Sequence, residues 1–297
     1  MCGIAGLFAK DPAFEQELGR HFAPMMLEMT DRGPDSAGFA VYRNVVDEGE
    51  AKLTALSREF IDWNALATQV EQALDGKLSI TDLGDHAVMR WSSSAALLEC
   101  YLREAFPQVE ILSSGQAIEI FKQKGLPEEA VSRFEIDKIT GSHALGHTRM
   151  ATESAVTTAH SHPFSTGDDL CLVHNGSLSN HNRIRVDLER EGVHFATDND
   201  SEVAAGYLTL RLRQGDSIEQ ALTHAIDDLD GFYTFAVGTR DGFSVLRDPI
   251  ACKPAVIAET DTWVAMASEY RAIAKLPGAA SASMWEPEPG RVYSWGR

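Results

Sequence analysis

The residue with the clearest chemical potential is a cysteine at the second position of the chain, in MCGIAGLF. If the initiator methionine is removed, Cys2 carries both a thiol and a free α-amine. The ordinary pKa of an α-amine is about 7.7–8.0, which suits a general base near neutral pH. A thiol needs such help because only about a few per cent of it is thiolate at pH 7. Cys2 is therefore a candidate nucleophile with its own base, and the alternative is a chance cysteine packed as a small hydrophobe.

A candidate oxyanion hole lies in LVHNGSLSN, where a predicted strand ends at His174 and turns at Asn175-Gly176. Asparagine offers a side-chain NH2 group, and glycine allows its backbone N–H to approach a ligand closely. Two converging donors at a strand end are what an oxyanion hole requires. An ordinary Asn-Gly hairpin turn is the alternative for the same residues.

Two further segments contain groups that could bind an amino acid. GHTRMATES places Arg149 and Thr152 just after a predicted strand, and an arginine fork with a nearby hydroxyl can bind a carboxylate. TDNDSEV places Asp200 where its carboxylate could hold an ammonium group. The alternatives are a surface arginine and an acidic helix N-terminus, respectively.

Two weaker patterns were weighed against these. The pair His160 and His162 in HSHPF could begin a metal site, but no third ligand follows at a suitable spacing, so no metal is predicted. DRGPDSAG contains Arg32 and Gly33 but lacks the lysine and the spacing of a phosphate-binding P-loop. We interpret it as a loop near the site.

The predicted secondary structure would hold these residues at strand ends. CGIAGLFA (2–9) is predicted to be a buried strand, which would fix a chain end that otherwise frays. Other strands are predicted over 39–45, 85–91, 109–114 and 170–174, with a strand-rich tail. Helices are predicted over 13–29, 61–74, 95–105, 116–124, 182–191, 201–213 and 217–229. Strands at both ends with helices between them indicate an α+β layered domain.

The composition disfavours several classes of function. The chain has 297 residues, of which 44% are hydrophobic and 24% charged, and 44 acidic against 26 basic residues give a net charge of -18. Binding to nucleic acid or to an anionic membrane surface is therefore disfavoured. No apolar run reaches the roughly 20 residues needed to span a bilayer, and MCGIAGLFAKDP lacks the basic region of a secretory signal. Four widely spaced cysteines without a C-x-x-C pair favour a reducing, cytoplasmic location.

Taken in order, the motifs resemble the glutaminase domain of class II glutamine amidotransferases, which are N-terminal-nucleophile (Ntn) hydrolases. The order is CGI, RGPDSAG, GHTRMAT, HPF, HNG and DSE, followed by LRDPIACKP, MASEYRAIAKL and EPGRVY. The resemblance implies a single domain over residues 2–297. Its fold would be the Ntn-hydrolase αββα four-layer sandwich, which belongs to the α+β class. The chain departs from the family pattern at Ala251, where the R-D-P motif usually has glycine.

The resemblance also implies a role for each candidate residue in cleaving the side-chain amide of glutamine. It implies Cys2 as nucleophile, with Asn175 and the Gly176 N–H as oxyanion hole. It implies that Arg149 and Thr152 bind the α-carboxylate and that Asp200 binds the α-ammonium group. It places Arg32 and Gly33 in the loop that closes over the amide end.

The stretch from about 44 to 139 is far longer than its equivalent in amidophosphoribosyltransferase or asparagine synthetase, so we expect it to have elements of its own. Within it, WSSSAALLECYLREAFPQVEILSSGQAIEIFKQKGLP resembles stand-alone amidotransferase subunits of glutamate synthase-like systems. The nearest match is the small subunit of N-methylglutamate synthase. That resemblance implies a synthase-type partner with a flavin and iron–sulfur clusters, and no cofactor on this chain.

The chain contains no second synthetase domain, no phosphoribosyl-binding stretch and no P-loop, so released nitrogen is expected to reach an acceptor on a partner. If the chain is a subunit of an N-methylglutamate synthase, the overall reaction joins methylamine to glutamate. Two alternatives stay open: a free-standing Ntn amidohydrolase acting on a γ-glutamyl compound, and a non-catalytic regulatory subunit that keeps the fold. The sequence also leaves open whether Met1 is removed, as a free-amine mechanism requires.

Overall fold

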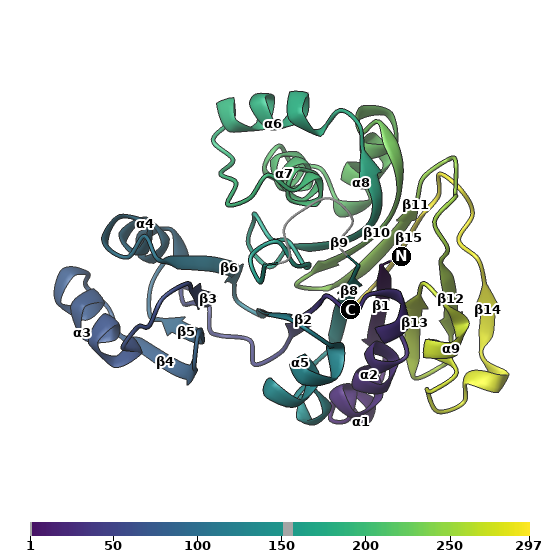
Figure 1. Cartoon of the computed structure of the whole chain (residues 1–297), viewed down its shortest axis with the longest axis horizontal. Helices are drawn as coiled ribbons and strands as arrows, with labels where there is room; N and C mark the ends of the chain where they lie inside the picture. Colours follow the sequence, from purple (N-terminus) through teal and green to yellow (C-terminus); the bar gives the residue numbers. More distant parts are fainter. Residues whose placement is uncertain (1, 151–156) are drawn as a thin grey trace.

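Two stacked sheets form the centre of the computed structural model, which describes residues 2–150 and 157–297 (Figure 1). The larger sheet has the order β14 (Ser283–Trp285), β12 (Val256–Glu259), β13 (Trp263–Ala267), β1 (Gly3–Ala9), β8 (His143–Arg149), β2 (Ser36–Tyr42), β7 (Ile118–Lys124). The smaller has the order β15 (Val292–Gly296), β11 (Gly242–Arg247), β10 (Gly231–Thr239), β9 (Cys171–Leu178). Their strand pairs are antiparallel.

Helices cover the outer face of each sheet (Figure 1). The outer face of the seven-stranded sheet carries α1 (Pro12–Glu15), α2 (Leu18–Leu27), α5 (Pro127–Arg133) and α9 (Tyr270–Ile273). The other outer layer consists of α6 (His181–Arg190), α7 (Asp200–Arg213) and α8 (Ile218–Asp228). The predicted αββα sandwich of class α+β is therefore confirmed.

The alternation of side chains along β1 shows how the layers are joined. Leu7 points into the core beneath α2, whereas Ile4 and Phe8 point into the core between the sheets. Successive residues of a strand face opposite sides, so a strand that is apolar throughout can be buried on both. All seven residues of β1 are buried, which fixes the chain immediately after Cys2.

A third sheet forms a separate lobe beside the sandwich (Figure 1). Its order is β4 (Leu78–Leu83), β5 (His86–Trp91), β3 (Ala51–Ser57), β6 (Val109–Gly115), and α3 (Trp63–Ala73) and α4 (Ala95–Ala105) complete a core of its own. This lobe spans 51–115, a shorter stretch than the 44–139 segment expected to be inserted. Residues 118–133 belong to the sandwich instead, as β7 and α5.

The lobe is attached to the sandwich through a buried lysine. The Nζ of Lys52 on β3 donates to the carbonyl oxygens of Arg43 (2.6 Å) and Ala117 (2.7 Å) and to the Glu119 carboxylate (3.1 Å). Burial lowers the pKa of Lys52, and the Glu119 charge opposes that effect. A buried charge that is fully hydrogen-bonded can be retained, so this contact fixes the lobe against β7.

One predicted element is wrong. Residues 116–124 were expected to be helical, but Ile118–Lys124 forms β7 and pairs with β2. The side chains of Ile118 and Ile120 enter the core between the sheets, and β-branched residues suit that position. Pairing with β2, which is distant in sequence, therefore decides the conformation. The expected helix over 13–29 is also divided, into α1 and α2.

Ala251, which stands where the family pattern usually has glycine, has the backbone conformation that favours glycine. Ala251 has φ +55°, in the left-handed region, and its carbonyl oxygen accepts from Arg247 at 2.6 Å. The turn is also held by the Asp248 carboxylate, which accepts from the Ala251 N–H at 3.1 Å. These bonds offset the cost of placing a side chain in this backbone region.

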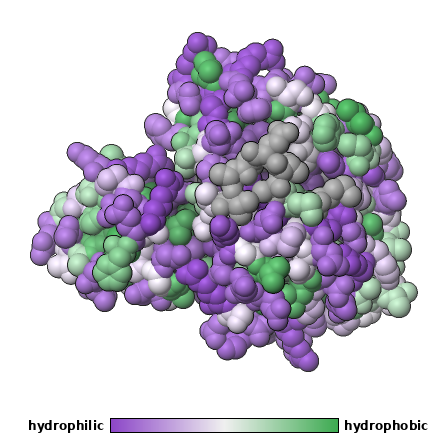
Figure 2. Space-filling view, in the orientation of Figure 1, coloured by the Kyte–Doolittle hydropathy of each residue, from purple (hydrophilic) through white to green (hydrophobic). Residues whose placement is uncertain are grey.

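The exposed surface agrees with the acidic composition. Figure 2 shows that the visible face is mostly hydrophilic and that hydrophobic residues occur on it in small, scattered patches. Within residues 2–150 and 157–297, no helix combines the length and the apolar character needed to cross a membrane.

Candidate active site

The backbone of Cys2 is held on two sides. Its carbonyl oxygen accepts a hydrogen bond from Arg32 Nε at 2.9 Å and another from Asn175 Nδ2 at 3.2 Å. Gly3, the next residue, pairs with Thr148 of β8. The candidate nucleophile is thus fixed to β1, to β9 and to the loop before β2.

The environment of Cys2 favours ionisation of its thiol. Burial raises the pKa of the thiol, but hydrogen bonding and charge at His147 lower it, and the resulting pKa is about 7. The ordinary thiol pKa is about 8.5. A large share of Cys2 is therefore thiolate near neutral pH, as a nucleophile requires.

One of the two candidate oxyanion donors, the Asn175 side chain, contacts Cys2, and Gly176 follows it on β9. Asn175 Nδ2 donates to Cys2 O and also to Ser268 Oγ at 3.1 Å, so both of its hydrogens are engaged. For Asn175 Nδ2 to donate to an oxyanion, its longer hydrogen bond, to Cys2 O, must break or be shared with the oxyanion. Gly176 has φ +149°, and a Cβ there would lie 2.0 Å from the Phe232 carbonyl oxygen, so only glycine fits.

The structure adds two site residues to which the sequence reasoning gave no role. Ser268 Oγ accepts from the Ile4 N–H at 2.9 Å as well as from Asn175, so it connects β1 to the oxyanion donor. Glu269 forms an ion pair with Arg32 at 2.6 Å. Both lie in MASEYRAIAKL, and this motif was the available signal.

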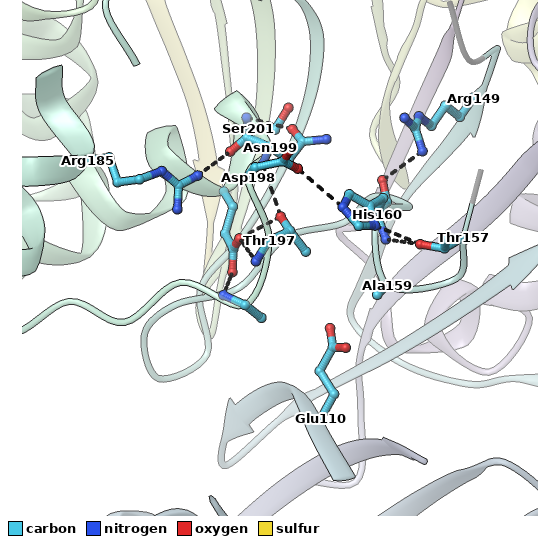
Figure 3. A network of polar contacts seen from close by, with 12 residues as sticks. Glu110, Arg149, Thr157, Ala159, His160, Arg185, Thr197, Asp198, Asn199 and Ser201 are labelled. Atoms are coloured by element: carbon cyan, nitrogen blue, oxygen red, sulfur yellow. Dashed lines mark hydrogen bonds and ion pairs between the residues drawn. The ribbon is translucent and has the colours of Figure 1, made fainter. Parts of the chain in front are cut away.

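Arg149, the last residue of β8, is almost entirely buried, at 5% exposure. Its guanidinium donates to the His160 carbonyl oxygen at 3.1 Å (Figure 3). Burial lowers the pKa of Arg149, while the negative charges of Cys2 and Asp35 raise it. A cation thus lies close enough to the thiol for the two charges to interact.

Gly33 packs directly on the end of β8. A Cβ at this position would lie 2.3 Å from the carbonyl carbon of Thr148 and 2.4 Å from the Arg149 nitrogen. The loop that carries Arg32 can therefore reach Cys2 only because residue 33 has no side chain. Thr152, the second expected carboxylate ligand, lies outside the described residues.

Asp200 is the first residue of α7, and its carboxylate reaches back to β9. One oxygen accepts from the Leu178 N–H at 2.9 Å, and the other accepts from Ser201 Oγ at 3.3 Å. The carboxylate is therefore held beside the strand that carries Asn175 and Gly176. An ammonium group at this position would replace no existing salt bridge to lysine or arginine within the described part of the chain.

The segment that follows β8 and the segment that precedes α7 are joined by a further contact between His160 and Asp198. His160 Nε2 lies 3.3 Å from an Asp198 oxygen, and His160 Nδ1 lies 2.7 Å from Thr157 Oγ1 (Figure 3). The second histidine of HSHPF, His162, contacts Ser201 instead, at 2.8 Å. Among residues 2–150 and 157–297, no three His, Cys, Asp or Glu side chains converge in a way that could hold a metal ion.

The arrangement contains the parts needed to cleave the side-chain amide of an amino acid. Cys2 supplies an ionisable thiol, and the Asn175 amide beside it can donate to a developing oxyanion. Arg149 supplies a cation for a carboxylate, and Asp200 an anion for an ammonium group. Of the predicted site residues, all except Thr152 lie in the described part of the chain.

Comparisons with known proteins identify the family of this chain. Residues 147–275 match the family model described as glutamine amidotransferase domain. The chain is 53% identical over 298 residues to the glutamine amidotransferase-like protein GlxB of Rhizobium meliloti, covering 99% of this chain and 98% of that protein. It is 32% identical to a putative glutamine amidotransferase of Methanothermobacter thermautotrophicus, covering 99% of each chain.

The fold is also similar to that of a solved structure. The glutamine phosphoribosylpyrophosphate amidotransferase from B. subtilis has a TM-score of 0.62 at 19% identity, covering 99% of this chain. This chain spans 49% of that protein. The similarity supports the αββα sandwich as the fold of this chain.

Proposed function

The chain belongs to the glutamine amidotransferase family, and from that premise we propose that it cleaves the side-chain amide of glutamine through a Cys2 thioester. The observation that carries this proposal is the contact of Asn175 with Cys2, whose thiol favours ionisation. The thiol has a pKa of about 7, and two donors lie on adjacent residues of β9. Arg149 and Asp200 would bind the two charged groups of the glutamine backbone.

The proposed reaction has two steps at Cys2. The thiolate attacks the amide carbon, a C–S bond forms, and the amide oxygen becomes an oxyanion that Asn175 Nδ2 and the Gly176 N–H stabilise. Collapse of this intermediate breaks the C–N bond, and the leaving nitrogen takes a proton and departs as ammonia. Water then attacks the thioester, which releases glutamate and restores the thiol.

The α-amine of Cys2 is the proposed general base, so we propose that Met1 is removed in the active protein. The amine would take the proton from the thiol and give it to the leaving nitrogen. The bonds from Arg32 and Asn175 to Cys2 O would hold the residue so that amine and thiol face the same substrate. An amine held in this way would need no separate catalytic base.

We further propose that the nitrogen passes to a synthase-type partner subunit of the N-methylglutamate synthase kind. The supports are the resemblance of the 91–127 segment to such subunits and the presence of a separate lobe over residues 51–115. In this proposal a flavin and iron–sulfur clusters belong to the partner. The site would then bind glutamine or glutamate, and the chain would act in the cytoplasm.

Intact mass of the native protein, before and after treatment with diazo-oxo-norleucine, tests the proposal. We expect the untreated protein to lack Met1 and the treated protein to gain one adduct, located on Cys2 and prevented by excess glutamine. Retained Met1 with no adduct would contradict the mechanism. Glutamine turnover by the chain alone, equal to that with synthase-type subunits, would favour the free-standing amidohydrolase.

Arg149→Lys is expected to raise the KM for glutamine by about 10- to 100-fold and to change kcat much less. Lysine keeps the charge but lacks the two-pronged fork that binds a carboxylate, and a charged hydrogen bond contributes about 1.5–3 kcal/mol. Steady-state glutaminase kinetics provide the measurement. Arg58→Lys is the matched control, because Arg58 pairs with Glu110 on the lobe, and its KM should equal that of the wild type. An unchanged KM in Arg149→Lys would remove this residue from the substrate site.

A further inference from the structure

A row of buried polar side chains lies behind the candidate active site. It contains three histidines and a serine, and each is at most 6% exposed: His147, His162, His174 and Ser201. His162 Nε2 lies 2.8 Å and His174 Nδ1 lies 2.9 Å from the same atom, Ser201 Oγ. The His147 ring lies against the His162 ring, with centroids 4.0 Å apart.

His147, at one end of this row of side chains, contacts Asn175, the proposed oxyanion donor. His147 Nε2 lies 3.1 Å from Asn175 Oδ1. Asn175 Nδ2 must face Cys2 O, because a carbonyl oxygen can only accept. The amide oxygen therefore faces His147, and since this oxygen can also only accept, Nε2 must carry the imidazole proton.

The other end contacts the candidate ammonium ligand. Ser201 has one hydroxyl proton and donates it to Asp200 Oδ1 at 3.3 Å, so the two imidazoles must donate to Ser201 Oγ. Burial lowers the pKa of His162 well below its ordinary value and that of His174 to about 4. Both rings are therefore neutral near pH 7, each with a single N–H directed at the serine.

We infer that His147 is a positioning residue for the proposed reaction, holding the Asn175 amide with its NH2 group toward the oxyanion. Without the Nε2–H, the Asn175 carboxamide could rotate and present its oxygen, which repels an oxyanion. The His162 ring, which lies against His147, and its contact with Ser201 hold His147 in place and connect the oxyanion donor to Asp200. This inference rests on the proposed function only for its kinetic consequence.

His147 also acts on Cys2 itself. It is the main group that lowers the pKa of the thiol against the effect of burial. The other charged or titratable groups that face the Cys2–His147 pair within the described residues include Arg32, Arg149, His162 and His174. Removing the imidazole leaves these groups in place, so its own contribution can be measured.

The test compares His147→Phe with His143→Phe. Phenylalanine keeps a ring against His162 but has no N–H and no charge. His143 is a matched control because it lies on the same face of β8, is also buried, and stacks on Tyr42 away from the site. For His147→Phe we expect kcat to fall by about 10- to 100-fold, the effect of leaving a buried acceptor unsatisfied. We expect the KM for glutamine to change less than about threefold, because the loss acts on the oxyanion donor and leaves both substrate ligands in place.

The second measurement needs no substrate. Alkylation of Cys2 by iodoacetamide, followed by peptide mass spectrometry across pH, should reach half its maximal rate near pH 7 in the wild type. Only the thiolate reacts, so the rate rises with pH through the pKa. In His147→Phe the midpoint should move upward by about one pH unit or more, and in His143→Phe it should stay.

Wild-type kinetics and an unmoved midpoint in His147→Phe would overturn the inference while leaving the proposed function intact. Conversely, a protein that never cleaves glutamine but shows the shifted midpoint would contradict the proposed function alone. If His147→Phe does not fold, nitrogen NMR of wild-type protein labelled at histidine decides. We expect a proton on Nε2 of His147, directed at Asn175 Oδ1, and an Nε2 without a proton would overturn the inference.

Discussion

Cys2→Ala is expected to lower glutamine hydrolysis by at least about a thousandfold, because it removes the only atom that the proposed mechanism joins to the substrate. The alanine variant should keep the fold, since the strand that follows is buried along its whole length and Cys2 is bonded through its carbonyl oxygen. The measurement is glutamate formation with and without the synthase-type partner. Free ammonia added to the complex should restore product formation, because the acceptor site would be unaffected.

The control for this variant is Cys100→Ala. Cys100 is an exposed cysteine on α4 of the lobe, so its removal should leave glutamine hydrolysis unchanged. Full glutamine-dependent activity in Cys2→Ala would contradict the thioester mechanism. It would favour instead the non-catalytic regulatory subunit that the sequence left open.

The fold was predictable from the sequence where local pattern and burial agree. The strand at 2–9 and the helix at 95–105 were expected, and they appear as β1 and α4. The helix expected at 116–124 was wrong, because partners distant in sequence decide whether such a short apolar segment pairs as a strand. The sequence showed no such agreement of pattern and burial for β3 or β4 of the lobe. Packing against α3 and α4 decides which face of these strands is buried.

The site was predictable to the extent that its chemistry lies in short motifs. Asn175 and Gly176 are adjacent in sequence, and the chemical need for two donors was readable from them. The contacts that support the site were not readable. The His147 and His162 rings lie against each other although 15 residues separate them in sequence, and Ser201 comes from a different layer. From the sequence, His162 belongs to the HPF motif and to a possible metal pair, and neither indicates its partner in the structure, the hydroxyl of Ser201.

The site residues are expected to contribute to catalysis in two ways, by binding the substrate and by stabilising the transition state. Arg149 and Asp200 would contact groups of glutamine that do not react, so changes there should appear in KM. Asn175 would contact the oxygen whose charge develops in the transition state, so changes there should appear in kcat. His147 acts through Asn175, so its variants should follow Asn175 and not Arg149.

Asn175→Ala is accordingly expected to lower kcat by about 100- to 1,000-fold, or about 2.7–4 kcal/mol of transition-state stabilisation, with little change in KM. Asn180→Ala is the matched control, because this asparagine lies just after β9 and its amide binds the Asp228 carbonyl oxygen, so its kcat should equal that of the wild type. Iodoacetamide alkylation of Cys2 separates the oxyanion role from simple damage, because that substitution forms no oxyanion. Asn175→Ala should therefore alkylate within about threefold of the wild-type rate while hydrolysis falls by hundreds. Equal losses in both reactions would mean that Asn175 serves only to hold Cys2 O, and the oxyanion hole would then have to be formed by other donors.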